Sequence, residues 1–473
     1  MSEHCGYVVK ITELHPHSNA DRLQVATIFG ASVIVDLNTK INDLGVYFPI
    51  DLQLSEEYCA QNNLVRKKDE NGNNIGGYLD PDKRNIRAMK LRGEKSEGLF
   101  MPLESLVYTG ETKFEIGDKI DVLNGHEICR KYIPKVQNRR GCVSEGNHTR
   151  KHFVPIAPLF AEHADTEQLV YNTEAFKPGD IIEITLKMHG TSGRTGYLPK
   201  FQGYKRTFWD KIFRREGTPI YDWDYVTGTR RVVLNDFDDG GYYGSNAFRA
   251  PHAKFFEGKL NKGETVYYEI VGFTDTGASI MASVANSKIS DKEFSKQYGK
   301  ETVFSYGCAP NGEVVKTRRD DEETQPQIVE EVPQSACYVY RMTMTNEDGV
   351  VIEYSPDFMR YRCEQMGAKC VMPFCKATID NEGVHVITPS GDSYGVPHET
   401  ECIGDAIKEV AEQYYDGPDP IGKTHVREGV VVRIINRPRF CAYKHKNFSF
   451  KVLEGIAKDI AAEPDIEEVQ DLL

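Results

Sequence analysis

The sequence predicts an α+β protein in which a small N-terminal β-barrel precedes a larger domain of strands and helices. Residues 6–53 consist of short, partly alternating apolar segments separated by glycine and asparagine turns, the pattern of closely spaced strands in a small barrel. Residues 402–415 have the apolar spacing of an amphipathic helix. Longer strand patterns recur in the second part of the chain, at 181–186, 266–273, 337–344 and 426–434.

Changes in composition divide the chain into segments. We expect an N-terminal domain at 1–134, a linker at 135–152, a second domain at 153–455 and an acidic C-terminal tail at 456–473. The linker is polar and basic and lacks apolar periodicity, which is typical of a connecting segment. Within the second domain, residues 311–335 are acidic and aperiodic, so we expect a looped insertion there.

The overall composition is that of an intracellular protein. The chain has 473 residues, 40% of them hydrophobic, and no apolar stretch long enough for a membrane-spanning helix. Its 11 cysteines form no metal-binding spacing, which favours reduced structural thiols in the cytoplasm. The formal net charge of −13 argues against nucleic-acid binding through bulk charge, so any such binding needs local basic patches.

A lysine ends one of the expected strands. The apolar pattern of 181–186 stops at Lys187, and Gly190, Gly193 and Gly196 follow. Glycine lets a backbone approach a ligand closely, and a lysine amine beside it could contact or attack a phosphate. Taken alone, the pattern is more typical of a strand that ends in a solvated turn.

Two further stretches favour a reactive lysine over a solvated turn. Glu428 is the only acid of the apolar strand 426–434, and Lys444 and Lys446 are two residues apart, on one face of the strand that follows. A nucleophilic lysine, a carboxylate for a metal and two lysines for phosphate form a complete set for nucleotidyl transfer.

In this order, KMHG, EGVVV and YKHK resemble motifs I, IV and V of the covalent nucleotidyltransferases, the superfamily of ligases and capping enzymes. The segment ITELHPHSNADRLQVATI at 11–28 is similar to the start of OB-like RNA-binding domains. The chain therefore resembles ATP-dependent RNA ligases with an N-terminal OB-like domain, related to the RNA ligase 2 group. This resemblance implies an adenylyltransferase domain of antiparallel sheets with flanking helices.

The resemblance also implies roles for single residues. Lys187 would form the covalent bond to AMP, Lys444 and Lys446 would bind phosphate, and Glu269 and Glu428 would hold Mg²⁺ or Mn²⁺. Glu269 stands in the apolar strand 266–273, where a carboxylate is costly to bury unless it is paired or serves a ligand. The expected ATP-binding residues are His189, Gly190, Arg194, Arg230, Glu269, Tyr338 and Tyr340.

Three of these assignments leave alternatives. Arg231 fits as well as Arg230, and either Tyr338 or Tyr340, which we expect on one strand face, could stack on adenine; core packing is the default for both rings. His189 stands where the common motif I has an aspartate, a form similar to that of the RNA ligases with an OB-like domain. Its alternative role is that of a structural loop residue.

Residues 200–231 combine basic and aromatic side chains. This composition favours contact with a nucleic acid through charge and stacking, and an amphipathic helix with its rings in the core is the alternative. We expect Asp165 and Glu167, which precede motif I, to act as helix-start residues.

The function implied by the resemblance is ATP-dependent ligation of RNA. A 3′-hydroxyl and a 5′-phosphate end would be joined through lysyl-AMP and an adenylylated 5′ end, in RNA repair. The alternatives are sealing of DNA or mixed RNA/DNA nicks, which the residues do not discriminate, and a non-catalytic nucleic-acid-binding protein. We expect ATP and RNA, with a nicked duplex as one form, as partners of a cytoplasmic monomer without membrane contact.

Overall fold

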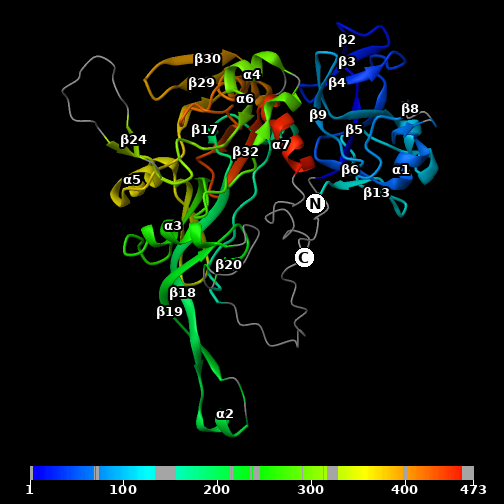
Figure 1. Ribbon diagram of the computed structural model, residues 1–473. Coiled ribbons are helices and arrows are strands. Elements are labelled where there is room, and N and C mark those ends of the chain that lie inside the picture. The colour runs from blue at the N-terminus through cyan, green and yellow to red at the C-terminus, as the bar shows by residue number, and fades with distance from the viewer. Residues whose placement is uncertain are drawn as a thin grey trace, which may run out of the picture. The chain divides into compact units, whose positions relative to one another are not determined.

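The computed structural model describes residues 4–68, 70, 74–133, 156–213, 215, 217–234, 237, 245–289, 291–312, 314–316, 329–397 and 403–460 (Figure 1). The linker expected at 135–152 lies outside the described residues, as do 317–328 of the expected insertion and 461–473 of the expected tail. The described chain forms two compact units. The first is drawn from Met1–Gln137, Asn286–Lys296 and Phe448–Pro464, and the second from Asn138–Ala285, Gln297–Asn447 and Asp465–Leu473.

The first unit consists of short antiparallel strands, which confirms the prediction for its sequence. Four strands pair in the order β11 (Leu99–Pro102), β5 (Leu44–Phe48), β1 (Gly6–Lys10) and β12 (Lys119–Ile120). A second sheet contains β2 (Glu13–Pro16), β3 (Leu23–Ile28) and β4 (Ala31–Asp36). Shorter strands pair as β6 (Leu52–Leu54) with β15 (Cys129–Lys131), β7 (Lys67–Lys68) with β8 (Asn74–Gly76), β9 (Ala88–Leu91) with β10 (Glu94–Glu97), and β13 (Val122–Leu123) with β14 (His126–Glu127).

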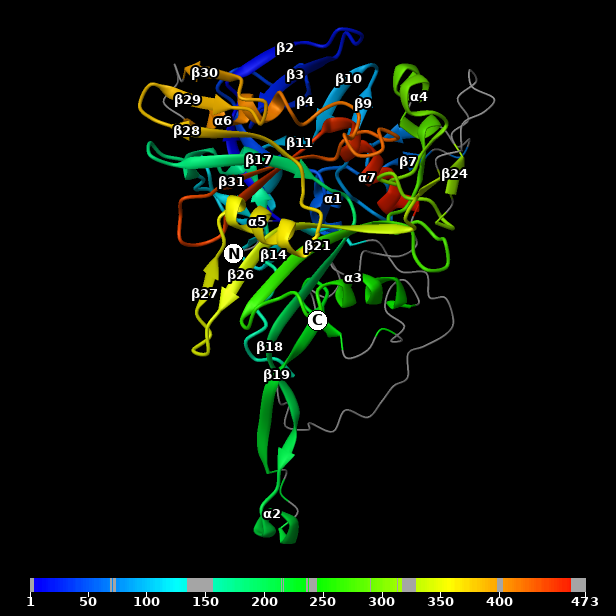
Figure 2. The ribbon, with the colours of Figure 1, turned by 90° about the vertical axis from the view of Figure 1, so that its left-hand side faces the viewer.

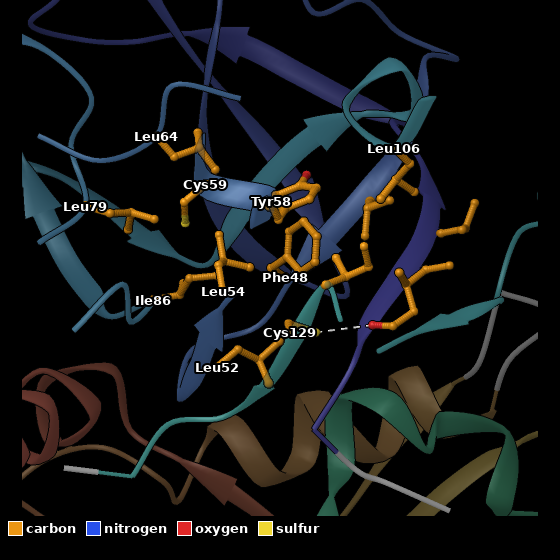
Figure 3. Close-up of a cluster of buried hydrophobic side chains, with 14 residues drawn as sticks. Phe48, Leu52, Leu54, Tyr58, Cys59, Leu64, Leu79, Ile86, Leu106 and Cys129 are labelled. Carbon is orange, nitrogen blue, oxygen red and sulfur yellow. Dashed lines mark hydrogen bonds between the residues drawn. The ribbon is translucent and has the colours of Figure 1, made fainter. Parts of the chain in front are cut away.

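An apolar core holds these strands against helix α1 (Glu56–Gln61) and the 3₁₀ helix η1 (Leu103–Thr109) (Figure 3). Phe48 and Tyr58 are fully buried, with ring centroids 5.4 Å apart. Burial of each such ring stabilises the unit by about 1.5–3 kcal/mol. The Ser55 hydroxyl accepts a hydrogen bond from the Tyr58 backbone N–H and so caps the helix, while the Tyr58 hydroxyl donates to Ser105.

Helix α7 (Phe448–Ile460) belongs to the first unit, whereas the sequence analysis assigned residues 448–455 to the second domain. Its Phe450 and Leu453 are fully buried, and Lys451 Nζ lies 2.5 Å from Glu97 Oε2 of β10. The 3₁₀ helix η5 (Asn286–Ile289) and the start of α4 (Lys292–Tyr298) belong to the same unit. Amphipathic spacing identifies such a helix but does not tell which of two cores it joins.

The second unit contains two large sheets, and this architecture confirms the predicted fold class. A seven-stranded sheet has the order β16 (Glu167–Gln168), β32 (Cys441–Lys446), β31 (Gly429–Ile434), β17 (Ile181–Lys187), β28 (Pro373–Ile379), β29 (Gly383–Ile387) and β30 (Ser393–Pro397). A six-stranded sheet has the order β20 (Val233–Leu234), β19 (Thr218–Gly228), β18 (Thr191–Lys205), β21 (Glu264–Gly272), β26 (Ser335–Thr345) and β27 (Val351–Glu353). All their pairs are antiparallel except β16 with β32.

Helices and short strands complete the second unit. The helix expected at 402–415 is α6 (Ile403–Glu412), which buries Ile407 and Val410 on its apolar face. The other helices are α2 (Phe208–Ile212), α3 (Ala250–Phe255) and α5 (Pro356–Met366), with 3₁₀ turns η2 (Leu169–Tyr171), η3 (Thr173–Ala175) and η4 (Ala247–Arg249). Short strands pair as β22 (Val284–Ala285) with β23 (Glu301–Thr302), and β24 (Val314–Lys316) with β25 (Val329–Glu331).

One alternative and one local expectation are corrected. Residues 200–231 do not form an amphipathic helix: most of them lie in the hairpin of β18 and β19 (Figure 2). Glu167 lies in β16, and the first 3₁₀ turn begins only at Leu169, so Asp165 and Glu167 do not start a helix. None of the helices in the described ranges has both the length and the apolar composition needed to cross a membrane.

Candidate active site

Three neighbouring strands bring a buried carboxylate between two lysines. Lys187, the last residue of β17, pairs with Gly429 of β31, which in turn pairs with Lys446 of β32. The Glu428 side chain is 1% exposed, and its Oε1 lies 2.9 Å from Lys187 Nζ and 3.5 Å from Lys446 Nζ. We call Lys187, Glu428 and Lys446 the lysine row. A buried carboxylate is costly unless it is paired, and here two ammonium groups pair with it.

Gly429 allows the row to form. Its φ of +149° is in the region that favours glycine, and a Cβ atom there would lie 2.1 Å from the His445 carbonyl oxygen and 2.8 Å from Lys446 Cα. Any side chain at this position would therefore force β31 and β32 apart. Such a separation would move the Glu428 carboxylate away from Lys446.

Strand alternation places Lys444 and Lys446 on one half-buried face of β32. Between them, His445 is buried and faces the other way, with Nε2 3.3 Å from Glu412 Oε1 of α6. Lys444 pairs with Val431 on β31. The two expected phosphate-binding lysines thus extend from one strand, β32, which β31 separates from β17 and Lys187.

The turn after Lys187 leads directly from one sheet into the other. Gly190 lies so close to β21 that a Cβ atom would be 2.3 Å from the Ile270 carbonyl oxygen and 2.9 Å from Glu269 Cγ. The His189 backbone N–H donates to the Tyr306 hydroxyl at 2.7 Å, and the His189 ring packs edge-on against Phe304. Both contacts fix the backbone that follows Lys187.

Glu269 lies half-buried on β21, opposite Ser192 of β18 and Tyr338 of β26. Its Oε2 is 3.5 Å from Ser192 Oγ. The buried Arg249, which the sequence analysis did not identify, donates to the Ser192 carbonyl and the Thr191 hydroxyl. Arg249 lies in a short 3₁₀ turn without a recognisable motif, so its sequence context gave no signal.

The donor atoms present fit a hard divalent cation rather than a zinc-type site. No group of three or more His, Cys, Asp or Glu side chains among the described residues could hold a metal. A cation here would depend on the Glu269 and Glu428 carboxylates together with water and phosphate oxygens, the set that Mg²⁺ ordinarily uses. Burial, and next the charges of Asp419, Glu428 and Glu269, raise the pKa of Tyr306 well above its usual value, so these acids lie around one tyrosine.

Three buried residues near the row were missed by the sequence analysis. Tyr306 packs against His425, with ring centroids 4.5 Å apart, and Asp419 and His425 are fully buried in the segment that leads to Glu428. Asp419 Oδ1 accepts from the Ile421 backbone N–H, whereas its Oδ2 has no hydrogen-bond partner among the described residues. The segment GPDPIGKTHV contains an acid and a histidine shortly before Glu428, and this was a usable signal in the sequence.

Arg230 and Arg231 share one partner, the Asp165 carboxylate. The sequence could not choose between these arginines, and the structure shows both paired with the same acid. His163 Nδ1 lies 3.0 Å from the Tyr340 hydroxyl. Burial lowers the pKa of His163 to about 3, and the charges of Arg230, Arg341 and Lys187 act in the same direction. The His163 ring thus connects Tyr340 to the segment that contains Asp165, the partner of Arg230.

Arg194 is 2% exposed, and its guanidinium donates to the carbonyls of Phe160, Ala161 and Thr229. These contacts hold the backbone just before Arg230, so we assign Arg194 to positioning that segment. Tyr338 contacts other groups than Tyr340, since Lys369 Nζ lies 5.6 Å from its ring centroid. A bulge in β26 causes this difference: Tyr268 pairs with Val339 and Tyr267 with Arg341, which leaves Tyr340 as the extra residue.

Comparisons with known proteins agree with this architecture. A family model of the OB-fold domain matches residues 6–103. A Naegleria gruberi RNA ligase variant solved with AMP and manganese is 15% identical, with a TM-score of 0.52 over 95% of this chain and 98% of that chain. A variant with ATP and manganese is 16% identical, with a TM-score of 0.51 over 96% and 98%. The same ligase with pyrophosphate is 15% identical, with a TM-score of 0.51 over 94% and 97%.

A search of curated protein sequences gave no match. The likeness to the solved ligases therefore extends over nearly the whole chain at low identity. It establishes a common fold, an OB-fold domain combined with a domain of two antiparallel sheets.

Close packing at Gly190 generates a stability prediction. We expect Gly190→Ala to lower the free energy of unfolding by about 1–3 kcal/mol, because the new methyl group must push the β21 backbone away. Gly395→Ala in β30 is the control, since its Cβ would meet no atom closer than 3.9 Å. Urea unfolding measures both variants. Equal stability of the two would contradict the close approach of the turn to β21.

The buried Asp419 generates a pH prediction. Burial raises the pKa of Asp419 from 3.8 to about 7, so the folded state keeps a proton that the unfolded state releases. Stability should therefore fall as the pH rises through this range. We expect Asp419→Asn to flatten the change between pH 3.8 and about 7, the pKa of this carboxyl in the unfolded and in the folded state, measured by urea unfolding. Asp348→Asn, in an exposed turn, should keep the wild-type slope, and an unchanged slope in Asp419→Asn would refute the assignment.

Proposed function

We propose that the protein is an ATP-dependent RNA ligase that acts through a covalent bond between Lys187 and AMP. The observation that carries the proposal is the lysine row, in which the Glu428 carboxylate lies 2.9 Å from Lys187 Nζ and 3.5 Å from Lys446 Nζ. The fold shared with the Naegleria gruberi RNA ligase, solved with ATP, AMP, pyrophosphate and manganese, supports the nucleotide and the reaction class.

In the first step, the Lys187 ammonium loses a proton to solvent, and the neutral amine attacks the α-phosphorus of ATP. A P–N bond forms, the bond to pyrophosphate breaks, and the amine proton passes to solvent. Lys444 and Lys446 are fixed cations on the neighbouring strand, suited to the negative charge on the phosphate oxygens. Glu428 orients the Lys187 side chain before attack. A divalent cation held by Glu269 and Glu428 would supply further charge neutralisation.

In the second step, an oxygen of an RNA 5′-phosphate attacks the AMP phosphorus, the P–N bond breaks and Lys187 regains its amine. In the third step, a 3′-hydroxyl attacks the activated 5′-phosphate, and AMP leaves as the phosphodiester forms. The product is a rejoined strand, as in repair of a broken RNA. Tyr340, whose hydroxyl lies 3.0 Å from His163 Nδ1 and whose ring is less buried than that of Tyr338, is the ring we assign to the nucleotide base.

A non-catalytic nucleic-acid-binding protein is the alternative from another class. Such a protein does not need a lysine next to a buried carboxylate. Burial of the Glu428 carboxylate costs free energy unless both lysines compensate its charge. The intact lysine row therefore favours catalysis. Sealing of DNA or mixed strands would use the same lysine row. An assay with RNA and with DNA substrates distinguishes the two ligase activities.

The decisive test is transfer of label from ATP. We expect the purified protein, incubated with α-³²P-labelled ATP and Mg²⁺ or Mn²⁺, to retain a covalent label on a denaturing gel, and Lys187→Ala to lose it completely. Lys376→Ala is the matched control, because Lys376 lies in β28 of the same sheet and pairs with Asp357. That variant should label like the wild type.

The outcome that contradicts the proposal is a folded wild-type protein that takes no label and is not already adenylylated. Mass spectrometry of the intact protein before the assay checks for AMP that is already bound. A 5′-phosphorylated RNA and a DNA of the same sequence, offered to the labelled enzyme, then separate RNA joining from DNA joining.

A further inference from the structure

The hairpin of β18 and β19 extends beyond the rest of its sheet. β21 pairs with β18 only from Thr191 to Gly196, whereas β19 follows β18 as far as the pair of Lys205 with Thr218. Both ribbon views show α2 at the far end of this hairpin (Figures 1 and 2). None of the described residues from 199 to 225 is buried. The outer part is therefore a two-stranded ribbon without a core.

Such a ribbon is only marginally stable in water unless side chains across the strands support it. Aromatic pairs do so here: Tyr197 stacks on Tyr225 with centroids 4.8 Å apart, and Phe201 lies 6.0 Å from Tyr221. At the tip, the Thr207 hydroxyl and the Asp210 carboxylate form a reciprocal capping box that starts α2. The tip thus has a defined conformation.

Three large rings are exposed at this tip. The exposed fractions are 71% for Phe208, 63% for Trp209 and 60% for Phe213. Trp209 stacks on Phe213 with centroids 6.0 Å apart and planes 18° apart, and Phe208 meets Trp209 edge-on at 5.8 Å. The rings contact one another instead of a core, and an exposed apolar cluster of this kind marks an interaction surface.

The charge at the tip is opposite to that of the whole chain. Residues 205–216 contain five basic and two acidic residues, a balance of +3 against −13 for the protein. The Arg215 guanidinium lies 5.5 Å from the Phe213 ring centroid. Of the two acids, Asp210 accepts a hydrogen bond from the Thr207 hydroxyl, and this bond lowers the pKa of the Asp210 carboxyl. Cations next to exposed rings suit a partner that has both phosphates and aromatic bases.

We propose that this tip, formed by Lys205, Arg206, Phe208, Trp209, Phe213 and Arg215, binds single-stranded RNA. Bases stack on the exposed rings, and the neighbouring cations pair with the phosphates. The inference deepens the proposed ligase function, on which it rests, because it names an element that holds the substrate strand. A purely apolar protein partner would leave the positive charge unexplained.

The test follows the fluorescence of Trp209 in the full-length protein. The chain has two tryptophans, so Trp223→Phe leaves Trp209 as the single reporter. We expect a 5′-phosphorylated single-stranded RNA to quench its emission, and added salt to weaken the binding. In the wild-type background, anisotropy of a labelled RNA should show that Phe208→Ala or Trp209→Ala weakens binding by about 5-fold to 150-fold.

Ile220→Ala is the matched control, since Ile220 is an exposed apolar residue of the same hairpin that has no ring. It should bind RNA like the wild type. Circular dichroism checks that each variant is folded. RNA binding that is unchanged in the ring variants overturns the proposal. A blue shift of Trp209 emission with anionic phosphatidylserine vesicles, without quenching by RNA, overturns it in favour of a membrane surface.

Labelling from ATP, performed in parallel on the wild type, keeps the two ideas separate. A labelled protein whose Trp209 is not quenched by RNA overturns the tip surface and supports the ligase. Quenching without any label supports the tip surface as an RNA site and overturns the ligase function. Both signals together support both proposals.

Discussion

The buried carboxylate of Glu428 is the constraint on which the candidate site depends. A charge at this depth requires compensation, and Lys187 and Lys446 supply it from the strands on either side of β31. This pairing depends on the register of the three strands and on the absence of a side chain at Gly429. Both lysine amines are half-buried. Lys187 is thus held by backbone pairing rather than by a loop, which suits the accurately aligned nucleophile that we propose it to be.

Tyr306 connects the two segments that approach the lysine row. Its hydroxyl accepts from the His189 backbone after β17, and its ring packs on His425 before β31. Residues far apart in sequence are therefore braced by one buried side chain. Arg194 and Arg249 have similar roles on the six-stranded sheet, where each donates to backbone carbonyls near the site. The side chains of Tyr306, Arg194 and Arg249 thus hold the backbone around the site in position.

Local pattern was sufficient for much of the fold and of the lysine row. Lys444 and Lys446 follow from strand alternation, and Lys187 and Glu428 follow from charges at the ends of apolar strands. Contacts between distant segments were not predictable from one sequence. The pairing of Asp165 with Arg230, the bulge that separates Tyr338 from Tyr340, and the packing of α7 in the first unit all depend on tertiary structure.

The absence of any buried residue among those described from 199 to 225 also bears on how the protein can evolve. The exposed tip residues Phe208, Trp209 and Phe213 belong to no buried cluster of the described residues, so the tip can vary while the lysine row stays intact. Selection can therefore act on the tip separately from the chemistry. For an engineer, the hairpin is a replaceable module on which a different recognition element could be grafted.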